Sequence, residues 1–237
     1  YIFYPIYSII QGITEFIPIS SSGHLNILEI IVNNENSRNL LYETTAHMAS
    51  LLALLLYLLK NDHFSKANIK LNFIPITLAT IPAVIVGLTL ITLQYDFVNI
   101  KLIGITSIVG AILLHISDIK IFHKMKIESL QLRFIIAGLF QCLAYLPGFS
   151  RSGSCIIAFR LLGETRKSSS IKSLYLGIPI ILLSFISNLR NLESISLDYN
   201  LLIIFFVTFI TAYLTLIFFI NFINKIGFKP FVIYRII

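Results

Sequence analysis

Charged side chains are scarce in this sequence, and their scarcity excludes an ordinary soluble protein. Only 12% of the 237 residues are Asp, Glu, Lys or Arg, about half of the roughly 25% that soluble domains carry. Hydrophobic residues make up 57% of the chain, and the mean hydropathy is +0.87. Together with long apolar runs, this composition predicts an all-α polytopic membrane protein that forms one integral domain over residues 1–237.

Cysteine is scarce as well, because Cys142 and Cys155 are the only two in the chain. Both lie in apolar surroundings, which does not resemble a disulfide framework or a metal cluster. No cleavable signal peptide is visible, and the first apolar span can direct insertion by itself. The formal net charge of +7 does not indicate nucleic-acid binding, because the lysines and arginines gather in short loops between apolar spans.

Apolar segments of about 20 residues are long enough to cross the hydrocarbon core as helices. Besides an N-terminal hydrophobic helix that begins within residues 1–10, such spans are predicted at 40–59, 73–93, 100–116, 171–189 and 201–223. Two segments, 11–25 and 134–163, are too interrupted by proline and glycine to form one clean helix each. Because irregular backbone is tolerated at membrane depth only inside protein or beside a watery cavity, both broken segments are expected to line a polar cavity.

Basic residues between the spans predict which ends of the helices face the cytoplasm. The loops 60–72 and 117–133 and a basic tail are assigned to the cytoplasmic side, and the turn 94–99 and the loop 190–200 to the outer side. The tail contains Lys225, Lys229 and Arg235. Three further cations, Arg160, Arg166 and Lys167, are expected to anchor helix ends at lipid headgroups.

The two broken segments resemble each other when one is laid over the other with Gln11 matched to Gln141. The same alignment, without a gap, matches Ser20 with Ser150, Ser22 with Ser152, and Gly23 with Gly153. Weak repeats on broken hydrophobic segments are typical of membrane proteins whose two halves meet at a shared site. The sequence therefore predicts two related halves, approximately 1–116 and 117–237.

Polar residues in the broken segments point to the binding of an anion. Gln11 and Glu15 are four residues apart and share a helical face. Pro18 ends that helix, and the serines that follow can form an anion-binding turn. Arg151 suits bidentate binding of phosphate. Glu15 and Arg151 each cost roughly 2.5–3.5 kcal/mol inside a membrane, so both are expected to be functional, with a purely structural ion pair as the alternative.

Five stretches of the chain carry a resemblance to a known family. They are G-I-T-E-F-I-P-I-S-S-S-G-H-L (12–25), Y-E-T-T-A-H-M-A (42–49), T-I-P-A-V-I-V-G (80–87), L-P-G-F-S-R-S-G (146–153) and G-F-K-P-F-V-I-Y-R (227–235). Together they resemble the bacitracin-resistance type of undecaprenyl-pyrophosphate phosphatases over essentially the whole chain. The differences include Cys155 after S-R-S-G, where threonine is common, and Lys172 in a usually apolar stretch.

The resemblance implies a fold of six transmembrane helices and two re-entrant helix pairs arranged as an inverted repeat. It implies an enzyme that cleaves undecaprenyl pyrophosphate to undecaprenyl phosphate and inorganic phosphate, which recycles the lipid carrier for cell-wall synthesis and confers bacitracin resistance. It further implies a divalent cation, Mg²⁺ or Ca²⁺, and a location in the bacterial cytoplasmic membrane with the site open to the outer face. The expected partners are the lipid substrate and the bilayer, and a homodimer stays open.

The resemblance also implies roles for single residues. Glu15 would hold the metal ion or position water, and Ser21 is the preferred nucleophile or phosphate ligand. His24 would act as general acid and base or as the nucleophile, so Ser21, His24 and water stay open as attacking groups. Arg151 would clamp the pyrophosphate. The remaining expected substrate-binding residues are Gln11, Ser20, Ser22, Gly148, Ser150, Ser152 and Gly153.

Two further points stay open at the level of the sequence. Glu43 and His47 share one helical face, and they would either support the metal or phosphate or form a satisfied polar pair in the bundle. The alternative function is a flippase or transporter of the polyprenyl phosphate carrier, because broken helices in inverted repeats are typical of transporters. His24 and the serines favour the phosphatase, since transport alone needs no proton-transfer group.

Overall fold

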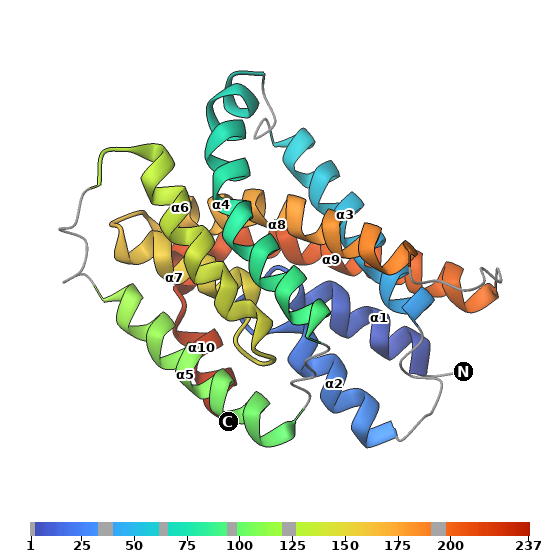
Figure 1. The fold of residues 1–237 in the computed structure, drawn as a ribbon. Coiled ribbons are helices and arrows are strands. Elements are labelled where there is room, and N and C mark those ends of the chain that lie inside the picture. The colour runs from blue at the N-terminus through green and yellow to red at the C-terminus, as the bar shows by residue number, and fades with distance from the viewer. Residues whose placement is uncertain (1–2, 33–39, 62–65, 94–98, 120–126, 191–197) are drawn as a thin grey trace.

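A computed structural model describes residues 3–32, 40–61, 66–93, 99–119, 127–190 and 198–237 (Figure 1). Every regular element in these residues is a helix. In chain order they are α1 (Phe3–Thr14), α2 (Ser21–Val32), α3 (Leu40–Lys60), α4 (Lys66–Thr92), α5 (Ile100–Asp118), α6 (Leu130–Gln141) with the short 3₁₀ helix η2 (Cys142–Tyr145), α7 (Arg151–Leu161), α8 (Arg166–Arg190), α9 (Tyr199–Ile226) and α10 (Lys229–Ile236). The predicted all-α class is confirmed.

Five helices are long and apolar enough to cross a membrane, among the residues that the structure describes. They are Leu40–Lys60, Asn72–Thr92, Ile100–Asp118, Arg166–Arg190 and Tyr199–Ile226. Each coincides with a span that the sequence predicts, so the polytopic character of the chain is confirmed. The finer layout of six crossings and two re-entrant pairs stays a prediction.

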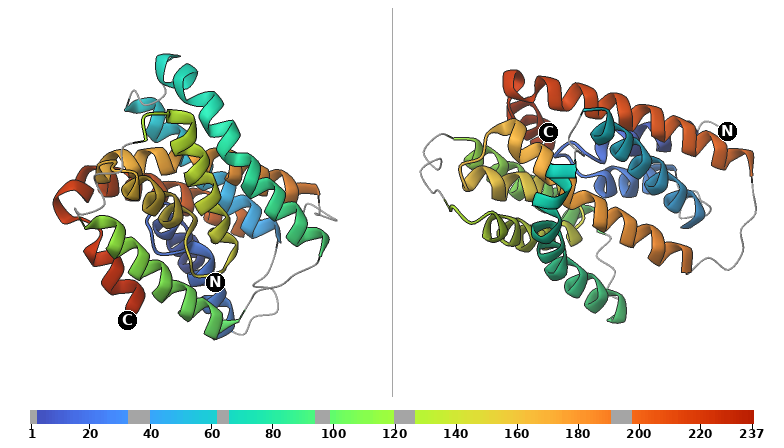
Figure 2. Two further views of the ribbon diagram at one scale, coloured as in Figure 1. Left: turned by 60° about the vertical axis from the view of Figure 1, so that its left-hand side comes forward. Right: turned by 90° about the horizontal axis from the view of Figure 1, so that it is seen from above.

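Two short helices from the broken segments lie against long helices from the other part of the chain. α1 packs on α9, and α6 packs on α4. Glycines permit both approaches: a Cβ on Gly12 would lie 1.9 Å from Thr211 Oγ1, and a Cβ on Gly138 would lie 2.0 Å from the carbonyl oxygen of Ala79. The division into two related halves stays a prediction. Two related halves would each contribute a short helix that packs on a long helix of the other half, as α1 and α6 do. The views in Figure 2 show α1 beside α9 from two further directions.

The turns after α1 and η2 sit at the centre of the main apolar core. Phe16 and Phe149, one from each turn, pack in the same cluster as Leu54 of α3 and Leu216 of α9. Both phenyl rings are almost completely buried. This packing fixes the turns relative to the long helices, so polar side chains that point away from the core have defined positions.

Three arginines at one end of the molecule are paired more tightly than expected of headgroup anchors. Arg160 and Arg166 both bind the carboxylate of Asp118, with nitrogen–oxygen distances of 3.0 and 2.7 Å. Arg133 lies 2.8 Å from Glu164, which also binds Lys172. Headgroup anchoring is therefore the wrong interpretation of Arg160, whose side chain is only 5% exposed.

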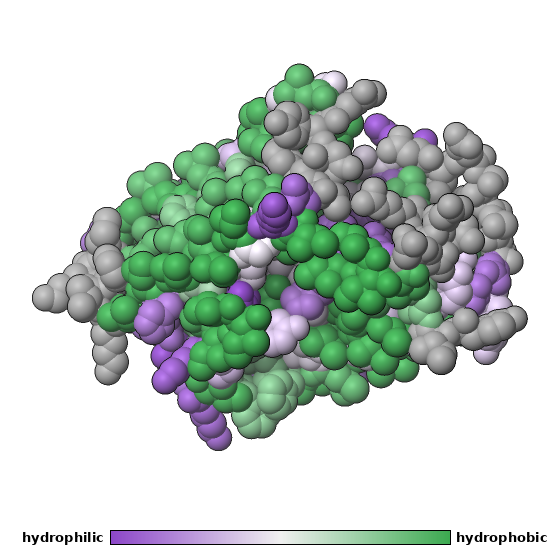
Figure 3. All heavy atoms as spheres, turned by 90° about the horizontal axis from the view of Figure 1, so that it is seen from below, coloured by the Kyte–Doolittle hydropathy of each residue, from purple (hydrophilic) through white to green (hydrophobic). Residues whose placement is uncertain are grey.

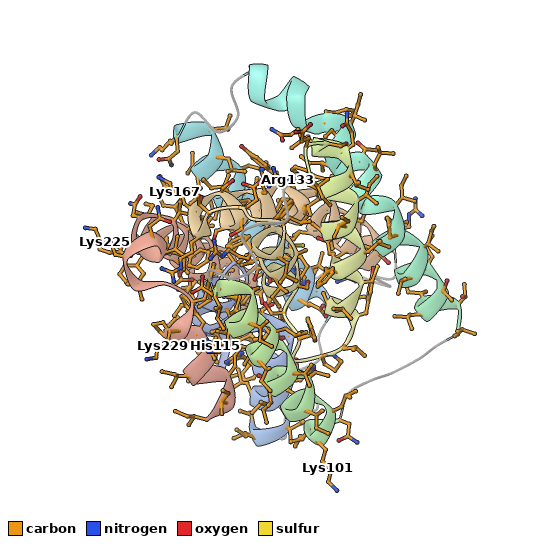
Figure 4. The ribbon with its side chains drawn as sticks, turned by 90° about the vertical axis from the view of Figure 1, so that its left-hand side faces the viewer. Lys101, His115, Arg133, Lys167, Lys225 and Lys229 are labelled. Carbon is orange, nitrogen blue, oxygen red and sulfur yellow. The ribbon has the colours of Figure 1, made fainter. Side chains whose placement is uncertain are left out.

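Several lysines lie on the surface instead. Figure 4 shows Lys167, Lys225 and Lys229 along one edge, where α8, α9 and α10 meet, with Lys101 at the far end of α5. All four are exposed. Lys172, the least expected residue for an apolar stretch, is accounted for by its pairing with Glu164.

The C-terminal segment does not form the surface tail that the sequence predicts. Residues 229–236 form α10, which packs along α5. Lys229 is exposed, but Arg235 is only 5% exposed, so the interpretation of Arg235 as part of a basic surface tail is wrong. Its guanidinium points into the protein, toward the turns described next.

Candidate active site

Two serine turns with the same local geometry stand at the starts of α2 and α7. Ser20 and Ser150 have φ angles of 74° and 75°, and no other non-glycine residue in the described chain has a positive φ. The Oγ of Ser20 accepts a hydrogen bond from the Gly23 amide at 3.3 Å, and that of Ser150 accepts one from the Gly153 amide at 3.1 Å. Such backbone angles cost about 1–3 kcal/mol per residue, so surrounding contacts must hold both turns in place.

The two turns touch each other directly. A Cβ on Gly23 would lie 3.3 Å from the Cα of Gly148. Ser152, at the start of α7, donates a hydrogen bond from its Oγ to the carbonyl oxygen of Ile17 at 2.9 Å. Gly148 has a φ of +91° and leaves no space for a side chain, because a Cβ would lie 2.4 Å from the carbonyl oxygen of Ile103. The broken segments therefore form one unit, as the sequence predicts for a shared site.

Glu15 is the centre of the polar contacts beside these turns. Its Oε1 accepts a hydrogen bond from Arg151 Nη2 at 2.7 Å. Its Oε2 accepts hydrogen bonds from Gln11 Nε2 at 3.0 Å and from Ser21 Oγ at 2.9 Å. The carboxylate is only 7% exposed. It is hydrogen-bonded both to Ser21, which follows the first serine turn, and to Arg151, which follows the second. The ion pair anticipated as a structural alternative is present, but it is part of this larger group.

His24 is held by contacts at both ring nitrogens. Its Nδ1 lies 2.6 Å from the carbonyl oxygen of Ser20, and its Nε2 lies 2.8 Å from the hydroxyl of Tyr234. Because a carbonyl oxygen only accepts, Nδ1 carries a proton, and in the neutral ring Nε2 accepts the hydrogen bond from the tyrosine. The two rings also stack, with centroids 5.6 Å apart. In this arrangement His24 is oriented toward α10 rather than bonded to Ser21.

Arg235 binds the backbone of both turns. Its Nη1 donates to the carbonyl oxygen of Pro18 at 3.2 Å, and its Nη2 donates to those of Gly148 at 3.0 Å and Phe149 at 2.9 Å. Neither Arg235 nor Tyr234 is among the site residues that the sequence predicts. The only signal was the segment G-F-K-P-F-V-I-Y-R, which contributed to the family resemblance without suggesting where these side chains point.

Glu43 and His47 lie beside Gln11 rather than beside the serine turns. His47 Nε2 is 3.6 Å from Glu43 Oε1, and its Nδ1 is 3.5 Å from Gln11 Nε2. The Gln11 amide therefore links His47 to Glu15, because its Nε2 contacts both side chains. The Gln11 Oε1 is buried and has no hydrogen-bond partner in the described part of the chain.

The structure separates the predicted phosphate ligands into accessible and buried groups. Ser22 is exposed, and Ser21 and Arg151 are partly exposed. The other predicted ligands are buried: Gln11, Ser20, Gly148, Ser150, Ser152 and Gly153. An incoming anion therefore meets Ser21, Ser22 and the Arg151 guanidinium, whereas the buried serines shape the turns.

The residues present fit a divalent cation only if the substrate supplies part of its coordination. Among the described residues no group of three or more His, Cys, Asp or Glu side chains could hold a metal ion. Glu15 supplies one carboxylate next to the unpartnered oxygen of Gln11. Mg²⁺ is commonly held by one or two carboxylates together with substrate phosphate oxygens, so this donor set agrees with a cation that binds with the phosphate.

Comparison with known proteins decides the family. A family model described as "Bacitracin resistance protein BacA" matches residues 4–237. The chain belongs to this family. It is 40% identical to an undecaprenyl-diphosphatase of Pelagibacter ubique over 240 residues, which cover 98% of the chain and 92% of the relative. It is 35% identical to an undecaprenyl-diphosphatase of Alcanivorax borkumensis (97% and 93% covered) and 34% identical to one of Idiomarina loihiensis (98% and 94%).

Proposed function

We propose that this protein is a membrane phosphatase that hydrolyses undecaprenyl pyrophosphate to undecaprenyl phosphate and inorganic phosphate. That reaction returns the lipid carrier to cell-wall synthesis and confers resistance to bacitracin. The observation that carries the proposal is the joining of Ser21 and Arg151 by one buried carboxylate, Glu15. The candidate nucleophile and the candidate phosphate-binding cation are each hydrogen-bonded to the candidate base, which supports the proposal.

The hydrogen bond between Ser21 and Glu15 supports a proton transfer in the first step. Ser21 already donates its hydroxyl proton to Glu15 Oε2, so Glu15 is positioned to take this proton as general base. The Ser21 oxygen forms a bond to the terminal phosphorus as the bridging P–O bond breaks, and the bond's electron pair leaves with undecaprenyl phosphate. A water oxygen then forms a bond to the phosphorus of the phosphoserine as the Ser21 O–P bond breaks. The proton held by Glu15 returns to the Ser21 oxygen, and the proton lost by the water leaves with inorganic phosphate.

Arg151 couples the arrival of the substrate to that step. Its guanidinium binds Glu15 at 2.7 Å, and it is the partly exposed cation beside Ser21. A pyrophosphate that takes the guanidinium competes with the carboxylate for the same donor, which makes Glu15 a stronger base. The N-termini of α2 and α7 add backbone N–H groups and positive helix-dipole ends, which favour the bound anion.

The expected Mg²⁺ or Ca²⁺ would be held by Glu15 together with phosphate oxygens of the substrate, and Gln11 Oε1 is a further candidate ligand. When bound, such an ion neutralises charge on the transferring phosphoryl group. The chain's own residues orient the nucleophile and the anion.

The surface agrees with a substrate that has a charged head and an apolar tail. The face that carries α2, α5 and α10 is mainly apolar, with polar residues near its middle (Figure 3). We place the protein in the bacterial cytoplasmic membrane with the lysine-bearing end of α8, α9 and α10 on the cytoplasmic side, following the positive-inside rule. The proposal that the site opens to the outer face rests on the family resemblance. Native mass spectrometry of the protein released from nanodiscs tests whether it forms a homodimer.

The experiment is release of phosphate from undecaprenyl pyrophosphate by the purified protein in detergent, with and without a chelator. We expect cation-dependent release that is lost in Glu15→Gln and Ser21→Ala. Ser22→Ala is the matched comparison: Ser22 also faces the incoming anion but does not bind Glu15, so its loss should weaken substrate binding without abolishing release. Full activity of Ser21→Ala would exclude Ser21 as the nucleophile. A folded wild type that releases no phosphate but moves polyprenyl phosphate across vesicles would instead support the transporter.

A further inference from the structure

Arg235 makes equivalent contacts with the two serine turns. The alignment that matches Ser20 with Ser150 also matches Pro18 with Gly148. These are the two residues whose carbonyl oxygens accept hydrogen bonds from Nη1 and Nη2 of Arg235, at 3.2 and 3.0 Å. One planar guanidinium therefore bridges the same backbone position in both turns.

The protein is shaped around this guanidinium. A Cβ on Gly110 of α5 would lie 2.1 Å from Arg235 Nη2, so only glycine leaves room for the arginine. The hydroxyl of Ser107, one helical turn earlier, donates to the carbonyl oxygen of Arg235 at 3.2 Å. Arg235 thus reaches the turns from a helix that is itself fixed to α5.

No acidic side chain among the described residues neutralises the charge of Arg235. Among the described residues it forms no ion pair, and its Nε has no hydrogen-bond partner. Burying an arginine without a carboxylate is costly. Carbonyl oxygens of the turns offset part of that cost, and an anion bound next to the turns would offset more of it.

We propose that Arg235 is a positioning residue: it holds the two serine turns in register, so that Ser21 and Arg151 face the same phosphate group. Each of these residues directly follows the strained serine of its turn. A shift of one turn against the other would therefore move the nucleophile relative to the phosphate-binding cation. The proposal rests on the phosphatase function given above.

The adjacent residue supports this role for α10. Tyr234 donates its hydroxyl to Nε2 of His24 on α2, while Arg235 binds the turn that precedes α2. Two consecutive residues of α10 therefore fix the start of α2 through a side chain and through the backbone. A helix that only filled space would not need both polar contacts.

The test is the rescue of an Arg235→Ala variant by guanidinium ions at millimolar concentration. Because a misplacement of about 1 Å can cost about 100-fold in rate, we expect kcat per folded molecule to fall about 100-fold, with a smaller change in KM. Guanidinium should restore part of kcat by occupying the vacated position between the carbonyl oxygens. Arg235→Lys should keep an intermediate kcat, since an ammonium cannot bridge both turns with the same planar geometry.

Arg160→Ala is the matched control, because Arg160 is also a buried arginine but binds Asp118 away from the turns. It should lower the melting temperature while leaving kcat per folded molecule unchanged, and guanidinium should not raise its activity. An Arg235→Ala protein with wild-type kcat, or with a reduced kcat that guanidinium does not raise, would overturn the positioning role. If Arg235→Ala does not fold, Arg235→Lys decides the question, and a wild-type kcat there would also overturn the role.

A second measurement keeps this inference separate from the phosphatase proposal. A non-hydrolysable polyprenyl methylenediphosphonate is titrated into wild type and Arg235→Lys. If the wild type releases no phosphate, the proposed function fails by itself. Weaker binding of the analogue by the variant would still support the alignment of the turns, whereas equal binding together with equal turnover would refute it.

Discussion

Gly177 lies on the buried face of α8 that contacts Arg151, and alanine at this position should disturb the guanidinium without disrupting the helix. A Cβ on Gly177 would lie 2.1 Å from Arg151 Nη1 and 3.0 Å from its Cζ. Ordinary contact begins near 3.4 Å, so the guanidinium must retreat until it clears the new methyl group. It is the far end of a flexible side chain, so it can retreat without a shift of the backbone.

The expected loss of activity follows from the contacts of that guanidinium. Its retreat breaks the 2.7 Å hydrogen bond to Glu15 and withdraws it from a phosphate bound beside Ser21. A hydrogen bond to a charged group contributes about 1.5–3 kcal/mol. Since about 1.36 kcal/mol corresponds to a factor of ten in rate, kcat/KM should fall about 10- to 150-fold.

Stability should respond differently from activity. Alanine is more favourable than glycine inside a helix by about 1 kcal/mol, which opposes the loss of the Glu15–Arg151 contact. Glu15 keeps its hydrogen bonds from Gln11 and Ser21. We therefore expect the free energy of unfolding to change by less than about 2 kcal/mol.

The assay compares phosphate release and thermal unfolding for Gly177→Ala and for Gly104→Ala. Gly104 is the matched control, because it lies in α5 and a Cβ added there would have nothing within 4 Å. This control should keep wild-type activity. If Gly177→Ala retains full kcat/KM, Arg151 does not act through its position beside Glu15. If its activity falls only as far as its folded fraction falls, the effect is general destabilisation.

Three further predictions test other parts of the molecule. Gly138→Ala should destabilise the fold by about 1–3 kcal/mol in thermal unfolding, because its Cβ would lie 2.0 Å from the backbone oxygen of Ala79; a melting temperature equal to that of Gly104→Ala would contradict this. Burial alone would raise the pKa of Glu164, but hydrogen bonds from Lys172 and Ser168 and the nearby cations outweigh it and lower that pKa. The contribution of Glu164 to the stability of the fold is therefore fully present above its pKa in the unfolded chain, about 4.3. It is lost as the pH falls through the lower pKa that Glu164 has in the folded protein. Glu164→Gln should weaken this acid dependence of the melting temperature, and an unchanged profile would exclude Glu164 as its source. In a radiolabelled assay with acid quenching, wild type should retain phosphate on the protein and Ser21→Ala should not; equal labelling would assign the phosphoenzyme to another residue.

Local patterns in the sequence predicted the parts of the site that local geometry controls. The spacing of four residues placed Gln11 and Glu15 on one helical face, and their side chains are hydrogen-bonded at 3.0 Å. Pro18 and Pro147 lie in the turns that follow α1 and η2, as predicted, whereas Gly23 and Gly153 lie inside α2 and α7 and interrupt neither helix. The alignment of the two broken segments correctly paired Ser20 with Ser150, whose φ angles are 74° and 75°.

The features that the sequence did not predict depend on contacts between segments that are far apart in the chain. Ser22 and Ser152 occupy matching positions in S-x-S-G motifs, yet Ser22 is exposed and Ser152 is 1% exposed. Ser152 is bonded to the carbonyl oxygen of Ile17, 135 residues away, and no pattern near Ser152 indicates that contact. Arg160 was assigned to headgroups for the same reason, because its partner Asp118 lies 42 residues earlier on another helix.

The contact of Arg235 with Pro18 has a consequence for how the protein is made. These residues are 217 positions apart, so the first serine turn is inserted into the membrane long before Arg235, which binds it, has been synthesised. α1 likewise waits for α9, its packing partner. A nascent chain must carry its strained turn without the hydrogen bond from Arg235 until α10 is synthesised, and closure of such long loops is slow. Partly synthesised chains should therefore be catalytically silent, and residues 227–237 are the segment whose alteration during biosynthesis would most directly prevent the site from forming.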